Sequence, residues 1–449
     1  MKLFQKMLVA GTALSFIAPV ASQASEIVNL EEMNNYVRSE KTSPRLHSKS
    51  FINDVKDDLA KLNSRIDGLE AKQSNFEAGG FSDTTTMDGK AVFTVGALDA
   101  DDSITALNEN TVFQYMYVMN LNSSFTGDDN LYVRIKTGNG NKTSSTQKDK
   151  PFNETATGTY LSSSNMNGDA LKVDKLWYSM PLGDNFTFTA GPKIENYYMH
   201  GTTPSIYKPV LKQFTLGGNA SAYGASTSPG AGLTWTGDSG LAISTNFTTK
   251  SGNSKGLLQD ESATSWATQV GYTQPQYSVS AIVNQKYNDW SDSYFSTSLG
   301  KERTYNDAAS TNIGLRAWWR PQETGTATPS ISVGFDTSET DATSNSNTTM
   351  YFVGLNWQDI FQADDRVGLA FGQPQKREDE TTDPFAWEAY YQFQVNDSVT
   401  LTPAVFGGSD RNGTSGSCLL YTSDAADERS SVYLGGRRII KKKRGRGGG

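Results

Sequence analysis

The stretch from Asn130 to Gly138, "NLYVRIKTG", alternates apolar and polar side chains. In an extended chain its Leu, Val and Ile side chains share one side, and its Tyr, Arg and Lys side chains share the other. A period of two is that of a β-strand with one apolar face, not that of a helix. The segment therefore predicts a strand with one face in an apolar medium.

The same alternation returns along the chain up to Phe406. Apolar residues occupy every second position in further runs at 186–188, 233–235, 241–247, 277–283, 313–319, 331–335, 351–357, 367–371, 385–393 and 399–405. Tight links such as "LGDN", "TGDSG", "TQPQ" and "VNDS" alternate with long polar ones such as "GQPQKREDETTDP". Short turns that alternate with long loops are typical of an up-and-down barrel across an outer membrane.

A large soluble sandwich or propeller is the alternative, and the mean hydropathy of −0.52 does not separate it from a membrane barrel. Aromatic residues near the ends of the apolar faces favour the membrane barrel, because they fit interfacial girdles. These residues are Trp235, Tyr272, Trp319, Trp357 and Phe393. An all-β fold is therefore predicted, a transmembrane up-and-down antiparallel β-barrel over residues 81–408.

The number of strands leaves one unaccounted for. Counting the alternating runs gives about fifteen strands up to Phe406, whereas a single-chain bacterial barrel has an even number. We therefore expect about sixteen strands, with the last strand missing from this chain.

The first 24 residues have the order of a secretory signal peptide. Two lysines precede an apolar run that ends in Ser22-Gln23-Ala24, which predicts cleavage after Ala24. A transmembrane helix is the competing interpretation, but the apolar run is short and is broken by Gly, Thr, Ser and Pro.

A polar segment at residues 25–50 precedes a heptad pattern at residues 51–78. The pattern predicts a short coiled-coil helix, and an amphipathic helix lying on its own domain is the alternative. The seam that would join the copies consists of Ile52, Val55, Leu59, Leu62, Ile66, Leu69 and Phe76. Taken by itself, the choice of Ile and Leu along this seam favours a coiled coil of two helices.

Four stretches resemble one family in order along the chain: "MKLFQKMLVAG", "RIDGLEAKQSNFEAGGFSDTTTMDGKAVFTVGA", "NLNSSFTGDDNLYVRIKTGN" and "EAYYQFQVNDSVTLTPAVFGG". They resemble the iron-uptake porins of the cyanobacterial outer membrane, within the broader carbohydrate-selective porin family. The resemblance implies a sixteen-stranded homotrimer in outer-membrane lipid that passes small solutes and inorganic ions, iron among them.

The family also implies an S-layer-homology domain that binds peptidoglycan-linked polymer. In this chain residues 25–50 occupy its place, without the expected aromatic, Asp-Val and Gly-Tyr pattern. We therefore expect a reduced or absent S-layer-homology region and at most a weak contact with peptidoglycan.

The basic tail has an origin outside the fold. Residues 418–428, "CLLYTSDAADE", can be back-translated into the end of a common transposase-based sequencing adapter, so residues 417–449 are interpreted as an adapter artefact rather than a basic arm. Without the eight Lys/Arg and three Asp/Glu of the tail, the net charge changes from −8 to −13, because the tail carries a net charge of +5. The support for a nucleic-acid partner is then lost, and no nucleic acid is expected.

A barrel of this size predicts passive diffusion through a watery lumen, with selectivity set by charged rings and an inward-folded loop. Side chains opposite the apolar faces point inward, which predicts as pore lining Arg134, Lys136, Arg316 and Glu388. The segment at residues 193–230 is the candidate constriction, with Tyr197, Tyr198, His200, Lys208 and Lys212 as its candidate residues. For each of these, an ordinary solvated side chain is the alternative.

An enzyme and a structural tether are the two alternative classes of function. An enzyme would need a nucleophile, a base and an orienting acid that converge, and His200 has no nucleophile motif near it, so no enzyme, cofactor or metal site is predicted. A structural protein that tethers the outer membrane to the cell wall would need a wall-binding module. The porin is therefore the leading prediction, and the tether is its alternative.

The signal peptide gives a direct test. We expect N-terminal sequencing of the protein purified from the cell envelope to begin at Ser25, because cleavage follows small residues. An intact Met1 in the envelope-located protein would contradict secretion through a cleaved signal.

Overall fold

The computed structural model describes residues 84–100, 110–140, 152–153, 158–250, 252–288, 290, 293–301, 308–341, 347–396, 398–409 and 415–425. For residues 99–100, 301 and 415–425 the backbone alone is described. The chain divides into two compact units, Met1–Gln73 and Ser74–Gly449, and all described residues belong to the second. The predicted signal peptide, the polar segment at 25–50 and the coiled coil at 51–78 with its seam therefore lie outside the described residues.

The second unit is all-β, as the period of two predicts. Its strands are β1 (Thr85–Ala100), β2 (Val112–Ser123), β3 (Asn130–Gly138), β4 (Lys172–Leu182), β5 (Phe186–Ile194), β6 (Ser228–Thr236), β7 (Leu241–Thr249), β8 (Thr264–Thr273), β9 (Tyr277–Tyr287), β10 (Ala309–Trp319), β11 (Ser330–Thr340), β12 (Thr348–Gln358), β13 (Arg366–Arg377), β14 (Ala386–Asn396), β15 (Val399–Ser409) and β16 (Ser415–Ala425). The described helices are short: η3 (Asn196–Met199), η4 (Lys212–Gly217) and α4 (Ser298–Lys301).

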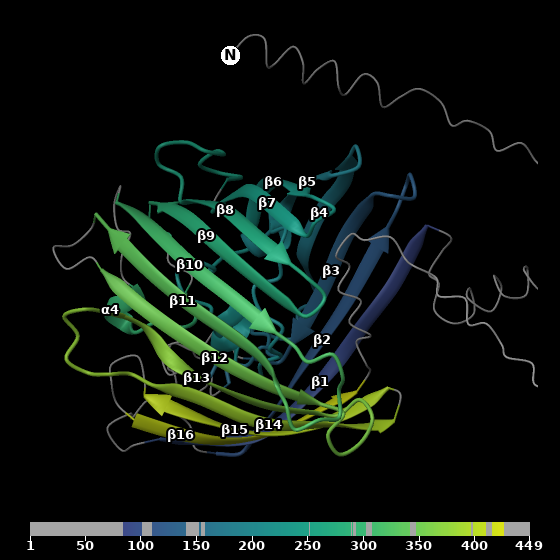
Figure 1. Cartoon of the computed structure of the whole chain (residues 1–449), viewed down its shortest axis with the longest axis vertical. Coiled ribbons are helices and arrows are strands. Elements are labelled where there is room, and N and C mark those ends of the chain that lie inside the picture. The colour runs from purple at the N-terminus through teal and green to yellow at the C-terminus, as the bar shows by residue number, and fades with distance from the viewer. Residues whose placement is uncertain are drawn as a thin grey trace, which may run out of the picture. The chain divides into compact units, whose positions relative to one another are not determined.

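Consecutive strands pair antiparallel from β1 to β15, which gives one continuous sheet curved around an interior (Figure 1). Taken alone, this sheet is open between β1 and β15. β16 pairs antiparallel with β15 on one side and with β1 on the other, so the strand order with β16 included is that of a closed barrel.

The sequence predicts that the last strand is missing. This expectation is corrected, because the backbone of β16 occupies the place of that strand between β15 and β1. The eleven residues of β16 precede the basic run of the tail and are long enough for one crossing. Backbone pairing needs no particular side chain, so β16 satisfies the edges that β1 and β15 would otherwise expose. The adapter origin of residues 417–449 stays a prediction.

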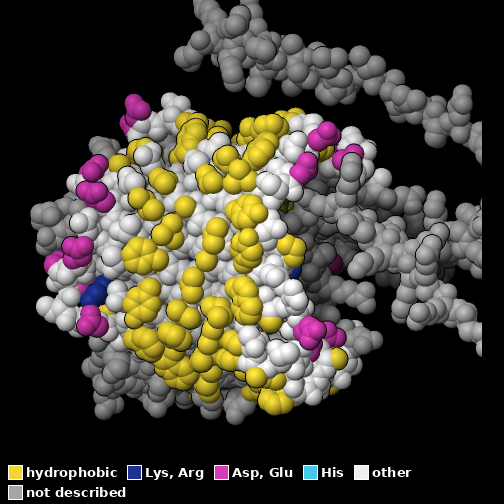
Figure 2. Space-filling view, in the orientation of Figure 1, with side chains coloured by type: hydrophobic (Ala, Val, Ile, Leu, Met, Phe, Trp, Pro, Cys, Tyr) yellow, Lys and Arg dark blue, Asp and Glu magenta, His cyan; other side chains and the backbone are white. Residues whose placement is uncertain are grey.

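The two faces of the sheet differ in polarity. In β10, for example, Leu315 is 51% exposed on the outside, whereas its neighbour Arg316 is 3% exposed and points inward. Figure 2 shows the outer face, where apolar side chains form a band across the front strands and Asp and Glu side chains gather towards the strand ends. The outside is therefore apolar at mid-height, and the inside is polar.

Two tight turns repeat one arrangement. Between β2 and β3, Asp129 accepts hydrogen bonds from the backbone N–H groups of Phe125 (2.9 Å) and Thr126 (2.7 Å) and from the hydroxyl of Tyr178 (2.7 Å). The hydrogen bond from Tyr178 lowers the pKa of Asp129 against the effect of burial. Between β12 and β13, Asp365 accepts in the same way from three backbone N–H groups and one tyrosine hydroxyl.

Each of these turns also exposes a phenylalanine, Phe125 at 69% and Phe361 at 75%. Each ring lies beside the tyrosine that donates to the turn aspartate, with centroid separations of 6.4 Å and 5.6 Å. Exposed aromatic side chains at the strand ends are what an interfacial girdle requires.

Leu315→Arg tests whether the outer band contacts hydrocarbon. We expect the substitution to lower the free energy of unfolding in lipid vesicles by about 2 to 4 kcal/mol, the cost of a charge on the lipid face at mid-height. The measurement is urea unfolding of the vesicle-inserted barrel. The control is Leu257→Arg, at a loop leucine of similar exposure, and an equal effect of both substitutions would contradict a lipid-facing band.

Candidate functional site

The link between β5 and β6, residues 195–227, lies inside the barrel; we call it the inner loop. Its η3 contacts β6, β7 and β8, and its η4 contacts β11 and β12, so the loop crosses the interior. Peptide groups in such a buried segment need hydrogen-bond partners. The inward side chains of the barrel wall supply them.

The first part of the inner loop is held by amide side chains. The side-chain amide of Asn196 donates to Asn246 Oδ1 (2.8 Å), and the hydroxyl of Thr248 donates to Asn196 Oδ1 (2.8 Å). Further along, the backbone N–H of Thr202 donates to Gln269 Oε1 (3.0 Å), and Gln269 Nε2 donates back to the carbonyl of Thr202 (3.1 Å). Each partner comes from an inward position of β7 or β8.

The middle of the inner loop is held by a buried ion pair. Arg316 pairs with Asp336 at 2.5 Å, and both side chains are fully buried. The same guanidinium donates to the carbonyls of Leu216 and Gly218, both at 2.9 Å. Leu216 to Gly218 all have positive φ, and a Cβ at Gly217 would lie 2.7 Å from Arg316 Cδ, so this kink requires glycine where the loop meets the guanidinium.

Glu388 of β14 holds the loop from the opposite wall. This carboxylate is fully buried and accepts from the backbone N–H of Val210 (3.1 Å), the backbone N–H of Leu211 (2.7 Å) and the hydroxyl of Tyr207 (2.8 Å). These three hydrogen bonds fix residues 207–211 of the inner loop against β14.

The sequence prediction of pore lining therefore needs a correction for two of its residues. Arg316 and Glu388 point into the barrel as predicted, but the inner loop covers both side chains. Strand alternation identifies the inward face, but it does not reveal that a loop packs on that face. These two residues position the loop and do not line open space.

A second segment, residues 158–171 between β3 and β4, pairs with the inner loop. Leu161 and Leu211 form an isolated antiparallel bridge, and the backbone N–H of Ser162 donates to the carbonyl of Val210 (2.8 Å). The ammonium of Lys136 on β3 donates to the carbonyl of Ser164 (3.3 Å). The predicted pore-lining residue Lys136 thus lies where the two segments meet.

A charged cluster lies on the β3–β4 wall opposite η3. Arg134 forms an ion pair with Asp174 and donates to the hydroxyl of Tyr198 (3.1 Å). Lys175 pairs with Glu195 at 2.9 Å. Burial would raise the pKa of Glu195, but the lysine ammonium groups outweigh it, so the pKa is lowered. The cluster therefore joins the wall to the start of the inner loop.

Sequence reasoning missed three members of this cluster: Asp174, Lys175 and Glu195. The register of β4 shifts against both of its neighbours, which brings the adjacent Asp174 and Lys175 to the same side. The two neighbouring charged residues break the period of two inside β4, and this break was the signal that could have indicated the irregularity.

Four aromatic rings stack beside the cluster. Tyr132 lies on Trp177 (centroids 4.2 Å apart), Trp177 lies on Tyr198 (4.6 Å), and Tyr198 lies on Tyr197 (4.5 Å). The stack runs from β3 over β4 onto η3. It brings the predicted constriction residues Tyr197 and Tyr198 against the wall and restricts their side-chain motion.

The remaining constriction candidates have different settings. Burial lowers the pKa of His200 to about 3, so its imidazole is neutral at physiological pH, and its Nδ1 lies 3.1 Å from Asn246 Nδ2. The Lys208 side chain is exposed, and its backbone N–H donates to Asn356 Oδ1 (3.1 Å). The Lys212 ammonium lies 5.3 Å from the ring centroid of Tyr294.

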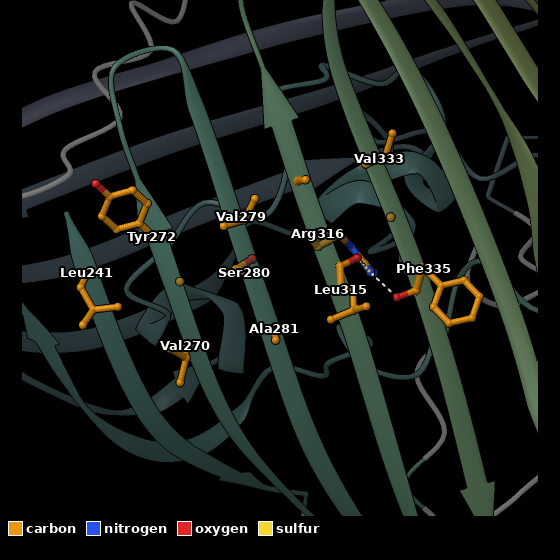
Figure 3. Close-up of a pocket in the computed structure, with 13 residues that line it drawn as sticks. Leu241, Val270, Tyr272, Val279, Ser280, Ala281, Leu315, Arg316, Val333 and Phe335 are labelled. Carbon is orange, nitrogen blue, oxygen red and sulfur yellow. Dashed lines mark hydrogen bonds between the residues drawn. The ribbon is translucent and has the colours of Figure 1, made fainter.

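An apolar depression lies on the outside of the barrel, over β7 to β11 (Figure 3). Outward side chains such as Val279, Leu315 and Phe335 line it, whereas the Arg316 guanidinium extends to the far side of the sheet. This depression is separated from the lumen by the sheet itself and does not belong to the candidate site.

Two kinds of feature are absent from the described residues. In that part of the chain, no group of three or more His, Cys, Asp and Glu side chains could hold a metal ion. Nor does any helix described there have the length and apolarity to cross a membrane.

The sequence of this chain is similar to one known family and to two known proteins. The model of the carbohydrate-selective porin, OprB family, matches residues 48–406. An uncharacterized protein of Nostoc sp. is 27% identical over 387 residues, which cover 78% of this chain and 65% of that protein. An uncharacterized protein of Synechocystis sp. is 24% identical over 396 residues, covering 79% and 70%. The match thus spans less than two thirds of the Nostoc protein.

Two solved structures are compared with this fold. The high-pH structure of Pseudomonas putida OprB has a TM-score of 0.51 and 9% identity, covering 75% of this chain and 93% of that chain. A mutant Rh. blastica porin has a TM-score of 0.47 and 10% identity, covering 76% and 100%. The likeness to the Pseudomonas protein supports a porin fold.

Glu388→Gln tests the anchoring of the inner loop. The substitution puts an amide NH₂ against backbone N–H donors, and we expect the free energy of unfolding to fall by about 1 to 3 kcal/mol, the cost of leaving buried donors unsatisfied. Urea unfolding measures it. Glu339→Gln, at an exposed outward position of β11, is the control, and equal stability of the two variants would contradict the anchoring role.

Proposed function

This chain belongs to the carbohydrate-selective porin family, OprB, and we propose on that basis that it is an outer-membrane porin for passive diffusion of small hydrophilic solutes and inorganic ions. The observation that carries the proposal is the combination of an apolar outside, a polar inside and a loop held across the interior. In such a barrel the lumen conducts and the loop sets the size limit.

Iron is the finer part of the proposal, and its support is the likeness of four sequence stretches to iron-uptake porins. Iron is here a solute that passes through, and no resident metal site is required. Liposome uptake compared between ferrous salt, other inorganic ions and small sugars separates these solutes.

The homotrimer and a weak peptidoglycan contact are also proposals. The heptad residues at 51–78 support association of copies, and the resemblance to the family supports three. Native mass spectrometry of the detergent-solubilised protein counts the copies. A structural tether between outer membrane and wall is the alternative function, and it has no use for a conducting lumen.

Planar-bilayer recording tests the proposed function. We expect the purified full chain to give discrete, ohmic current steps, because a watery lumen conducts in proportion to voltage. The control is the same detergent without protein. A chain that inserts as a folded barrel and stays electrically silent would favour the tether.

A further inference from the structure

The charged cluster inside the barrel has two further lysines as electrostatic neighbours, Lys136 and Lys212. With them the cluster comprises the cations Arg134, Lys136, Lys175 and Lys212 and the carboxylates Asp174 and Glu195, and the name is used for these six groups from here on. Counted as formal charges, four cationic and two anionic side chains leave a formal net charge of +2.

The excess belongs to two lysines. Asp174 pairs with Arg134, and Glu195 pairs with Lys175. Within the described ranges, no carboxylate oxygen lies within 4.0 Å of the Lys136 or Lys212 ammonium. Burial lowers the pKa of Lys212, with Glu195 acting against this effect, so an anion that arrives beside Lys212 stabilises its charged form.

Charges beneath the inner loop do not offset this excess. Arg316 and Asp336 are a buried pair. The buried ammonium of Lys286, which donates to the carbonyl of Gly224 (2.8 Å), and the buried carboxylate of Glu388 have opposite signs. The formal charges of these four groups therefore sum to zero.

The cluster borders water. The side chains of Arg134, Asp174 and Glu195 keep exposures of 21%, 30% and 14%. Arg134 and Asp174 lie on the β3–β4 wall, and Glu195 lies at the start of the inner loop, directly before η3. A solute that passes this point comes close to the two lysines.

We infer that this cluster makes the constriction selective for anions and binds small inorganic anions such as chloride and phosphate. The inference rests on the proposed porin function. A net positive charge between low-dielectric walls concentrates anions and repels cations, and guanidinium and ammonium groups are the usual donors to phosphate. Free ferrous ions would then pass less readily than iron bound in an anionic complex.

The chain as a whole is acidic, with a formal net charge of −8, and its outer rims carry the acidic side chains seen in Figure 2. Those charges lie in wide, solvated regions, where counter-ions screen them within about 10 Å at 0.1 M salt. Confined charges are screened less, so the constriction dominates the selectivity.

The test is the zero-current potential of the full chain in a planar bilayer with unequal KCl concentrations on the two sides. We expect the zero-current potential to have the sign given by chloride as the more permeant ion. Inorganic phosphate added at equal ionic strength should lower the KCl current. Channels that prefer potassium, or that phosphate leaves unchanged, overturn the inference and leave the porin function standing. A chain that forms no channels overturns both.

Charge-neutral variants locate the effect. Lys136→Gln with Lys212→Gln keeps most of both side chains and changes the formal charge of the cluster from +2 to 0. We therefore expect the chloride-to-potassium permeability ratio to fall at least about twofold. Lys255→Gln, on the exposed loop between β7 and β8, is the control and should leave the ratio unchanged. Equal chloride-to-potassium permeability ratios in the double variant and the control would show that other residues set the selectivity. That result would contradict the proposed anion site.

Discussion

A loop can lie inside a barrel only if the wall satisfies its peptide groups, because buried backbone donors and acceptors without partners are costly. The inner loop meets this constraint with side chains rather than with strands. Glu388 and Gln269 accept its N–H groups, and Arg316 and Gln269 donate to its carbonyls. The polar inner face of the barrel is thus partly a structural requirement, and its most deeply buried charges serve the loop and not the solute.

Much of the fold could be predicted from the sequence, because an outward apolar face leaves a period of two in most strands. The same period gave the inward direction of Arg134, Lys136, Arg316 and Glu388. It could not give the burial of the last two, which depends on contacts between residues far apart in the chain. Nor could it give the shifted register of β4, because a bulge changes the period over one or two residues, or the closing β16, which pairs through its backbone.

Charge is distributed unevenly between the outside and the inside. The chain is acidic overall, with acidic side chains near the strand ends, whereas the cluster where the two inner segments meet is cationic. Total charge therefore says little about the solute path. The aromatic stack from Tyr132 to Tyr197 holds η3 against the wall, so the charged groups keep fixed positions relative to one another.

The anchoring of the inner loop also bears on how the chain folds. Val210 and Glu388 are joined by a hydrogen bond although 178 positions separate them, and Ile206 donates to Ser332 across 126 positions. Contacts of such long sequence separation form slowly, because the intervening chain must be ordered first. Docking of the inner loop must therefore wait until β11 and β14 have taken their places. Before β11 and β14 are in place, the inner loop stays undocked. The packing of this loop is therefore the last folding step.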